Sequence, residues 1–527
     1  MRLALPILLV AAPMAAQTPG LPPSPLSARE KAAHLLDRLT FGPRPGEVDA
    51  LAKGGDTALA GWLQAQLHPA PEPALEASVR KAFPTQAMSL AEIQAAFPRP
   101  QAVAKAKGLD PADPDFKARL AALVPFEQRP ARIADEQAGQ KLMRAVESRD
   151  QLQEVLVDFW FNHFNVDESK GLDRWFVPSY ERDAIRPHVF GRFRDLLEAV
   201  AWHPAMLFYL DNWLSVKDGF QAPRLGAKGP KGLNENYGRE LMELHTLGVD
   251  GGYTQADVRE VARCFTGWSL ETPQRAAAPV FRPRAHDDDP KIVLGVRIAE
   301  GGRADGERVL DLLAASPATA KHLAFLLCRR FIADQPPPAA VDRVAQAYLR
   351  TGGDLRAVYE ALFTSPEFWS KAAAGAKVKT PFEFVASSIR ALDGHVDDPL
   401  PLTRTLARMG EPLYRCQPPT GYKDTADAWV STGALVERLR FGGALAKRQV
   451  PGVTWPEVPL PPADAPDQAL AALAPRLVPG GLSDGTRAAL LKAVEAQPQT
   501  YADGERRPVD STQLLGFLLG SPEFQRR

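Results

Sequence analysis

The chain has 527 residues, of which 45% are hydrophobic and 24% are charged. This composition is ordinary for a soluble globular protein with a large core, so the chain needs no partner merely to fold. The 63 basic and 63 acidic side chains cancel, which argues against a general electrostatic attraction to nucleic acid or to an anionic membrane.

The first residues resemble a secretory signal peptide, which we assign to residues 1–17. Arg2 precedes the apolar run from Leu3 to Val10, and several alanines follow before Gln17. We therefore expect export to the periplasm or the extracellular space. No transmembrane anchor is expected, because prolines interrupt this run and it is shorter than the roughly 20 apolar residues of a membrane span.

Proline-rich stretches divide the rest of the chain. We expect a Pro-rich mobile leader at 18–27, a main helical domain at 28–450 and a Pro-rich linker at 451–466. A C-terminal helical segment at 467–527 is expected to lie against the main domain. The three cysteines are far apart and odd in number, so the fold should not depend on disulfides.

Hydrophobic periodicity predicts a succession of helices. They are expected at 28–39, 45–52, 57–67, 128–165, 192–201, 234–247, 255–265, 306–314, 317–331, 341–351, 355–364, 381–392 and 434–446. Strand signals are few, and the clearest, at 280–282 and 291–294, are expected to pair as a hairpin around His286. The predicted fold class is all-α, a multi-helix globular bundle with at most one small β-hairpin.

The helix predicted at 234–247 carries the densest group of ionisable and amide side chains. At about 100° per residue, one side of this helix is apolar. The opposite side holds Glu235, Asn236, Arg239, Glu240 and Glu243. The helix should end at Gly248, and Thr254 with Asp257 has the pattern of a capping box for the next helix.

Two interpretations of this polar face remain open. Glu235, Arg239 and Glu243 are spaced to form a solvated ladder of ion pairs, which is worth only tenths of a kcal/mol per pair. Alternatively, the face lines a polar cleft behind the Gly-rich loop at 217–232. In that case Glu240 and Glu243, one turn apart, bind a hard cation or divide acid and base work.

Three histidines lie in or near the same blocks. His163 falls on the apolar stripe of its helix, so its ring should point inward and needs a partner, as a core histidine, a metal ligand or a general base. His245 lies at the border of the apolar side. His286, followed by Asp287, belongs to a charged loop that is either solvated or completes a divalent-cation site, although its spacing is not that of an EF-hand.

The chain lacks the familiar catalytic signatures. It contains no Gly-x-Ser-x-Gly, Gly-x-x-x-x-Gly-Lys, Gly-x-Gly-x-x-Gly, His-Glu-x-x-His or Cys-x-x-Cys-His sequence. Simple assignments to the serine hydrolases, NTPases, dinucleotide enzymes, zincins or c-type cytochromes therefore lose support. Tryptophans near the key blocks either pack in the core or form a sugar- or polymer-binding wall: Trp160, Trp175, Trp202, Trp213, Trp268 and Trp429.

Several blocks in one order resemble the bacterial family known as domain of unknown function (DUF) 1800. The blocks are His34–Pro43, Asp158–Val166, Asn234–Trp268, His286-Asp287 before 291–295, 364–368, and Gln417-Pro-Pro-Thr-Gly421 leading to Trp429. The resemblance implies a mostly helical exported protein, often encoded beside a sulfatase-like protein, and supplies no known reaction. The chain departs from the family pattern at Tyr422, where Trp is favoured, and at Asp288, where Gly is favoured.

These observations lead to two hypotheses of different classes. The first is an extracytoplasmic, metal-assisted hydrolase that acts with the sulfatase-like protein on a polymer or on a sulfated or phosphorylated ester. Its catalytic residues would be His163, Arg239, Glu240 and His245, and Glu235, Glu243, His286 and Asp287 would bind a divalent metal ion. The alternative is a non-catalytic secreted scaffold that binds a partner protein or a surface polymer. A convergent pocket favours the enzyme, and a flat apolar patch favours the scaffold.

Overall fold

The structure, a computed structural model, describes residues 20–221, 232–271, 278–457, 466–495 and 511–527. These residues form mostly helices, and the prediction of an all-α fold is confirmed. The first half contains α1 (Ala28–Leu39), α2 (Glu47–Leu67), α3 (Pro73–Ala82), α4 (Leu90–Ala96), α5 (Pro100–Ala106), α6 (Phe116–Leu123), α7 (Ala131–Glu147), α8 (Gln151–His163), α9 (Asp173–Ser179), α10 (Phe193–Ala201), α11 (Pro204–Tyr209), α12 (Asn236–Glu240) and α13 (Gln255–Cys264).

The second half continues the same pattern. Its helices are α14 (Ala304–Ala314), α15 (Pro317–Phe331), α16 (Pro338–Thr351), α17 (Leu355–Phe363), α18 (Pro381–Ala391), α19 (Leu400–Arg408), α20 (Thr432–Ala446), α21 (Pro466–Leu477), α22 (Asp484–Glu495) and α23 (Ser511–Leu519). Two short π-helices, Tyr180–Ile185 and Leu241–Thr246, extend α9 and α12.

One predicted helix break is confirmed and one predicted helix was wrong. The segments predicted at 45–52 and 57–67 are two helical segments within α2, separated at Gly55, whose φ of 62° and ψ of −159° are not helical. The single helix predicted at 128–165 is divided into α7 and α8, because the backbone at Ser148 is extended. Glu72 holds this break by accepting hydrogen bonds from the Ser148 hydroxyl and from the backbone N–H of Arg149.

The described residues form three two-stranded antiparallel sheets. The strands are β1 (Trp268–Leu270) with β2 (Pro279–Phe281), β3 (Lys291–Val293) with β4 (Val296–Ile298), and β5 (His395–Val396) with β6 (Val453–Thr454). The expected hairpin between 280–282 and 291–294 was wrong, since each segment pairs with a nearer neighbour. Leu294 and Gly295 both have positive φ, as in the two-residue type I′ turns that close tight hairpins.

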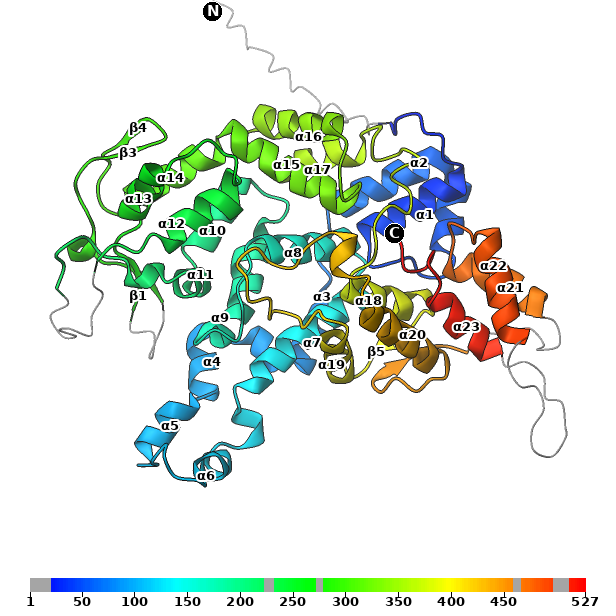
Figure 1. The fold of residues 1–527 in the computed structure, drawn as a ribbon, viewed down its shortest axis with the longest axis horizontal. Coiled ribbons are helices and arrows are strands. Elements are labelled where there is room, and N and C mark those ends of the chain that lie inside the picture. The colour runs from blue at the N-terminus through cyan, green and yellow to red at the C-terminus, as the bar shows by residue number, and fades with distance from the viewer. Residues whose placement is uncertain (1–19, 222–231, 272–277, 458–465, 496–510) are drawn as a thin grey trace, which may run out of the picture.

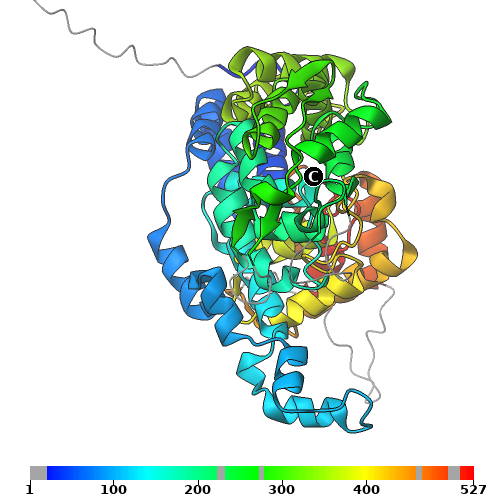
Figure 2. The ribbon, with the colours of Figure 1, turned by 90° about the vertical axis from the view of Figure 1, so that its left-hand side faces the viewer.

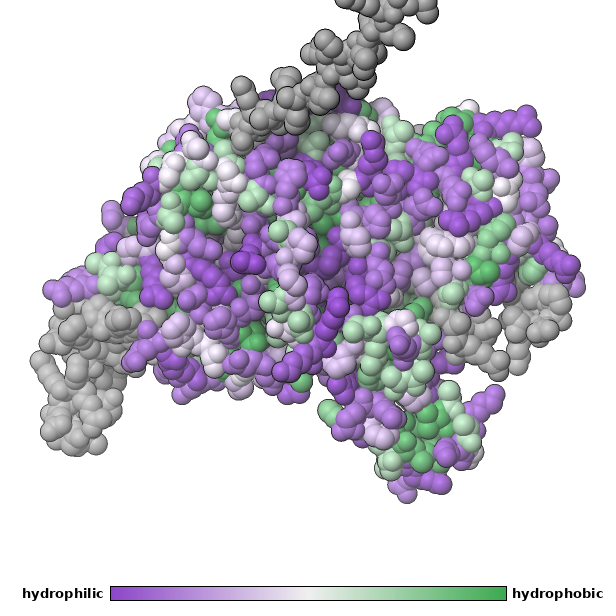
Figure 3. All heavy atoms as spheres, turned by 180° about the vertical axis from the view of Figure 1, so that it is seen from behind, coloured by the Kyte–Doolittle hydropathy of each residue, from purple (hydrophilic) through white to green (hydrophobic). Residues whose placement is uncertain are grey.

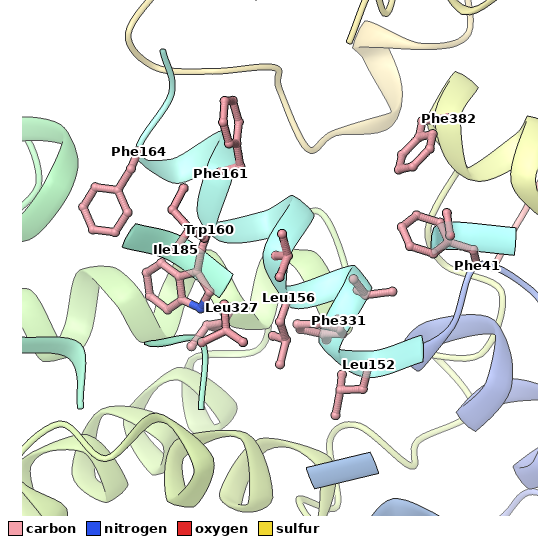
Figure 4. Packing of buried hydrophobic residues seen from close by; sticks show 14 of the residues in the cluster. Phe41, Leu152, Leu156, Trp160, Phe161, Phe164, Ile185, Leu327, Phe331 and Phe382 are labelled. Carbon is pink, nitrogen blue, oxygen red and sulfur yellow. The ribbon is translucent and has the colours of Figure 1, made fainter. Parts of the chain in front are cut away.

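Helix α8 lies in the middle of the molecule, with α15 to α17 on one side and α18 and α20 on the other (Figure 1). Its buried side chains meet α15 and the start of α18 in one continuous core (Figure 4). The arm formed by α4, α5 and α6 projects away from this body in two perpendicular views (Figures 1 and 2). The core therefore surrounds α8 and fixes the side chains that this helix presents.

Both proline-rich stretches are partly incorporated into the fold. In the leader, which was expected to be mobile, the Ser24 hydroxyl donates to the Trp369 carbonyl at 2.7 Å and Leu26 is buried. In the linker, β6 pairs with β5, and Arg448 lies over the buried Trp455 ring. The C-terminal helix α23 contacts α20 and α21.

The predicted signal peptide at 1–17 lies outside the described residues. Among the described helices, none combines the length and the apolar character that crossing a membrane requires.

Candidate functional site

The end of α8 forms one wall of a cavity of about 560 Å³. Asp158, Asn162 and His163 line it, opposite side chains from α15 and from the segment that follows α19. Figure 1 shows this segment, residues 411–429, in gold beside α8. The opposite side of α8 is buried in the core, so its polar end is left to face the cavity.

Asn162 holds the cavity-lining loop through two hydrogen bonds. Its side-chain N–H donates to the Tyr422 carbonyl at 2.9 Å, and its oxygen accepts from the Tyr422 backbone N–H at 2.7 Å. The neighbouring Gly421 has a φ of 69°. A Cβ there would lie 2.3 Å from the Asn162 carbonyl oxygen, so the loop can approach α8 only with glycine at this position.

Asn165 fixes the preceding part of the same loop. Its side-chain amide donates to the carbonyls of Cys416 and Pro418 at 2.8 and 2.9 Å. The Tyr422 hydroxyl donates to the Pro412 carbonyl at 2.7 Å. The two asparagines that flank His163 in sequence therefore position the 416–422 loop.

The charged floor of the cavity is built around Asp158. Its Oδ1 lies 2.6 Å from Lys141 Nζ, and its Oδ2 lies 3.8 Å from Arg330 Nη2. The Arg330 Nη1 group forms a second ion pair with the buried Glu383 at 2.7 Å. The Nε and Nη2 groups of Arg330 make no hydrogen bond within the described part of the chain. Nη2 therefore has only the long ion pair with Asp158, and both groups are buried donors without a hydrogen bond, which is costly.

Glu411 is the most strongly perturbed carboxyl group of the cavity. Burial, followed by the nearby charge of Asp158, raises its pKa from 4.5 to about 8. Its Oε2 accepts a hydrogen bond from the backbone N–H of Phe382 at 2.8 Å. Glu411 therefore carries a proton at neutral pH and is able to act as a general acid.

Three histidines, His163, His245 and His322, lie where the end of α8 meets the π-helix that follows α12. Nε2 of His163 lies 3.1 Å from the His245 carbonyl, so Nε2 carries the hydrogen and Nδ1 holds the lone pair. Burial holds the pKa of His163 well below its ordinary value. Burial likewise lowers the pKa of His245 to about 3 and lowers the pKa of His322. All three rings are therefore neutral at physiological pH.

His163 and His322 line the cavity, whereas His245 is enclosed behind them. Neither ring nitrogen of His245 has a hydrogen-bond partner among the described residues. This inward position follows from the π-helix Leu241–Thr246, since a wider turn changes which side chains point inward. Leu244, from the same π-helix, lines the cavity.

The polar face of α12 forms its own network at the surface. Glu235 lies 3.6 Å from Arg239 and accepts a hydrogen bond from the Gln255 amide at 2.7 Å. Glu240 is half-buried, and burial together with the charge of Glu243 raises its pKa. The capping box of Thr254, predicted for the next helix, is present. None of the carboxyl groups of this face lines the cavity beside α8.

His286 and Asp287 belong to a third location. His286 is fully buried, with Nδ1 2.8 Å from the Thr266 carbonyl and Nε2 3.2 Å from an Asp305 oxygen. Asp287 forms a bidentate ion pair with Arg263, with distances of 2.7 and 3.1 Å. Both side chains are therefore engaged in interactions that hold β3 against α13.

No three His, Cys, Asp or Glu side chains in the described ranges are arranged to bind a metal ion. The structure thus does not bring together Glu235, Glu243, His286 and Asp287, for which a shared metal was predicted. Asp287 pairs with Arg263 and His286 contacts Asp305. Glu235 instead lies beside Arg239 and Gln255.

Sequence reasoning missed the charged residues of the cavity other than the histidines. Asp158 could have been selected from the sequence, because it lies in the same sequence block as His163. Lys141, Arg330 and Glu411 come from three separate segments and belong to no motif. Only long-range contacts place them together.

The helical fold and the cavity define an all-α protein with a charged, partly enclosed site. The chain belongs to the family described as protein of unknown function (DUF1800), whose model matches residues 34–526. This match confirms the resemblance seen in the sequence blocks. No curated protein and no solved structure matches the chain.

Proposed function

We propose that the protein is an exported hydrolase whose active site is the cavity beside α8. The observation that carries this proposal is the meeting of a protonated buried carboxyl group, a neutral imidazole and a buried arginine on the walls of one cavity. Convergent groups with perturbed pKa values in a concave site are typical of catalytic centres.

Each group has a separate role in this proposal. Glu411 donates its proton to the leaving group, and the lone pair on Nδ1 of His163 accepts a proton from the attacking water. Arg330, whose Nε and Nη2 groups make no hydrogen bond among the described residues, stabilises negative charge that develops on the substrate. An ion pair with Lys141 holds the Asp158 carboxylate in place. The proposal uses His163 from the predicted site and replaces the α12 carboxylates by Glu411.

The lining residues support an anionic or strongly polar substrate. Lys141, Arg329, Arg330 and Lys423 contribute positive charge, whereas Asp158 and Asp424 contribute negative charge and Glu411 is neutral. A sulfated or phosphorylated ester, or an acidic polymer, complements this balance. The sulfatase-like partner is part of this proposal and is suggested by the family resemblance. The residues 1–17 provide the proposed route of export, and protein recovered outside the cytoplasm should begin near Gln17.

Purified protein should be assayed on a panel of chromogenic sulfate, phosphate and carboxylate esters and glycosides. The proposal expects turnover of at least one substrate by wild type, and loss of that turnover in Glu411→Gln while the fold is retained. Glu240→Gln is the matched control, because it makes the same change on the α12 face. Loss of turnover in Glu240→Gln with full activity in Glu411→Gln would move the active site to α12.

A specific observation favours a second candidate function, a secreted scaffold. The first half of α20 and Val430, two residues before this helix, expose apolar side chains: Val430, Leu435, Val436 and Leu439, with exposed fractions of 46, 36, 40 and 50%. Such a stripe is typical of a surface that binds another protein. Binding of the purified sulfatase-like neighbour, measured with wild type and with Leu439→Glu, tests this candidate. Equal binding by both proteins, or none by either, would count against it.

A further inference from the structure

A second and larger cavity lies where the projecting arm meets the body. It has a volume of about 820 Å³ and is lined by the arm on one side and by α9, α11 and the turn that follows α11 on the other. In Figure 3 the arm extends below the body, and apolar green surface on it is bordered by purple polar groups. This cavity shares no lining residue with the one beside α8.

The wall contributed by the body is aromatic. Phe208 and Trp213 are stacked, with ring centroids 5.6 Å apart and an interplanar angle of 17°. Trp175 lies in the same wall, and its indole N–H donates to the Phe97 carbonyl at 2.7 Å. Phe208 is held from one edge by Gly171, where a Cβ would lie 2.8 Å from the ring. The aromatic wall is therefore pre-formed.

The rim of the cavity is cationic. Arg99, Lys117, Arg129 and Arg174 line it together with one acidic residue, Glu168, which is paired with Arg174 at 2.7 Å. Arg129 donates to carbonyls of the arm and forms no ion pair with any residue that the structure describes. The side chains of Arg99 and Lys117 have neither an ion pair nor a hydrogen bond within the described ranges. The rim thus presents unneutralised positive charge above an apolar wall.

From this juxtaposition, we propose that the cavity between the arm and the body binds an anionic oligosaccharide. A sugar ring has an apolar C–H face that stacks on an aromatic side chain, while its acidic substituents lie at the ring edge and reach a cationic rim. The volume falls in the range of sites that bind small molecules. Carboxylated and sulfated sugars share this chemistry.

The geometry is less suited to other polyanions. A nucleic acid requires a basic surface that follows its backbone over several phosphates, whereas these cations surround one concave site on a chain of zero formal net charge. An acidic peptide has no flat apolar ring to place on the aromatic wall. The proposal does not rest on catalysis beside α8, because it concerns different residues and a different measurement.

The test is calorimetric binding to the full-length protein. The probes are an oligogalacturonate, which is carboxylated, a carrageenan oligosaccharide, which is sulfated, a neutral malto-oligosaccharide and poly-L-glutamate. The proposal expects one of the two acidic sugars to bind at least about tenfold more tightly than the neutral sugar and poly-L-glutamate, with affinity that falls as salt rises. The preferred acidic sugar identifies the acidic group.

Variants of the rim and of the wall locate the binding. Lys117→Gln removes an exposed, unpaired charge from α6 and should weaken binding about threefold, and Trp213→Ala should weaken it about tenfold or more. Lys105→Gln is the matched control, because it removes an exposed lysine from the same arm outside the cavity. It should bind like wild type.

Four results would overturn the proposal. They are no binding of either acidic sugar, equal binding of the neutral sugar, equal or tighter binding of poly-L-glutamate, and acidic-sugar binding that Lys117→Gln leaves unchanged. Trp213→Ala is interpreted only if its thermal unfolding matches that of wild type. If that variant does not fold, the Lys117→Gln result decides alone, because the exposed Lys117 side chain forms no ion pair or hydrogen bond among the described residues.

Discussion

The cavity beside α8 and the polar face of α12 contain the same kinds of charged groups in different surroundings. On α12, Glu235, Arg239 and Gln255 pair with one another at the surface. Beside α8, Asp158 and Glu411 are brought into one cavity from segments far apart in sequence. Water and neighbouring side chains stabilise the charges on α12. The protonation of Glu411 beside α8 instead depends on its burial. A high local density of ionisable residues in sequence is therefore a poor guide to which groups acquire unusual chemistry.

The largest expected effect is on catalysis. Glu411→Gln removes the proposed acid without changing the size of the side chain, and should lower turnover by about 10²–10⁴-fold. Wild-type activity should be highest at neutral pH and should fall as pH rises through about 8, where Glu411 loses its proton. Steady-state rates against pH measure both effects. An activity that persists unchanged above pH 10 would be incompatible with Glu411 as the acid.

The second prediction concerns the pH dependence of stability. Because the pKa of Glu411 is raised from 4.5 to about 8 in the folded protein, its stabilising contribution is complete below 4.5 and is lost as pH rises through 8. Glu411→Gln should therefore gain stability relative to wild type between pH 5 and pH 8.5, by on the order of 3 kcal/mol. Chemical unfolding of both proteins at several pH values measures this difference. Parallel curves would contradict the assignment.

The third prediction tests how the loop is held against α8. Gly421→Ala places a Cβ against the Asn162 carbonyl and strains a residue of positive φ. It should destabilise the protein by about 2–3 kcal/mol. Gly433→Ala is the control, because Gly433 is in the first turn of α20 and an added Cβ would meet nothing within 4 Å. Equal melting temperatures for the two variants would show that the loop is not held as described.

The smallest effect is expected on α12. Glu240 is half-buried beside Glu243 and has no ion pair among the described residues, so Glu240→Gln should change stability by less than about 0.5 kcal/mol. Turnover should remain within about twofold of wild type. Thermal unfolding and rate measurements on this variant complete the comparison with Glu411→Gln. A large loss of activity would restore α12 as the catalytic face.

Local patterns predicted much of the helical structure. The bounds of α1 and α15 agree with the predicted ranges, and the capping box of α13 is present as expected. These features depend on side chains a few residues apart. The division between α7 and α8 could not be predicted in the same way, because Glu72, the residue before α3, accepts the hydrogen bonds that hold it. The π-helix after α12 likewise changed the inward face by altering the period.

The candidate site was predictable only in part. His163 was expected to point inward and to need a partner, and its ring nitrogen does lie at the His245 carbonyl. Its selection as a catalytic residue remains a prediction. Glu411 could not be selected, since an isolated glutamate in a loop has no periodicity and no motif. Its raised pKa arises from burial and from the nearby charge of Asp158, which lies 253 residues earlier in the sequence.

The sequence alone determined the fold class, most helix positions and the family, because these follow from local periodicity, caps and ordered blocks. The tertiary structure decided which charges are buried together and which are solvated. That decision has a physical cause. A carboxyl group changes its chemistry when it loses water and gains a charged neighbour, and both conditions depend on segments that meet only after the chain has folded.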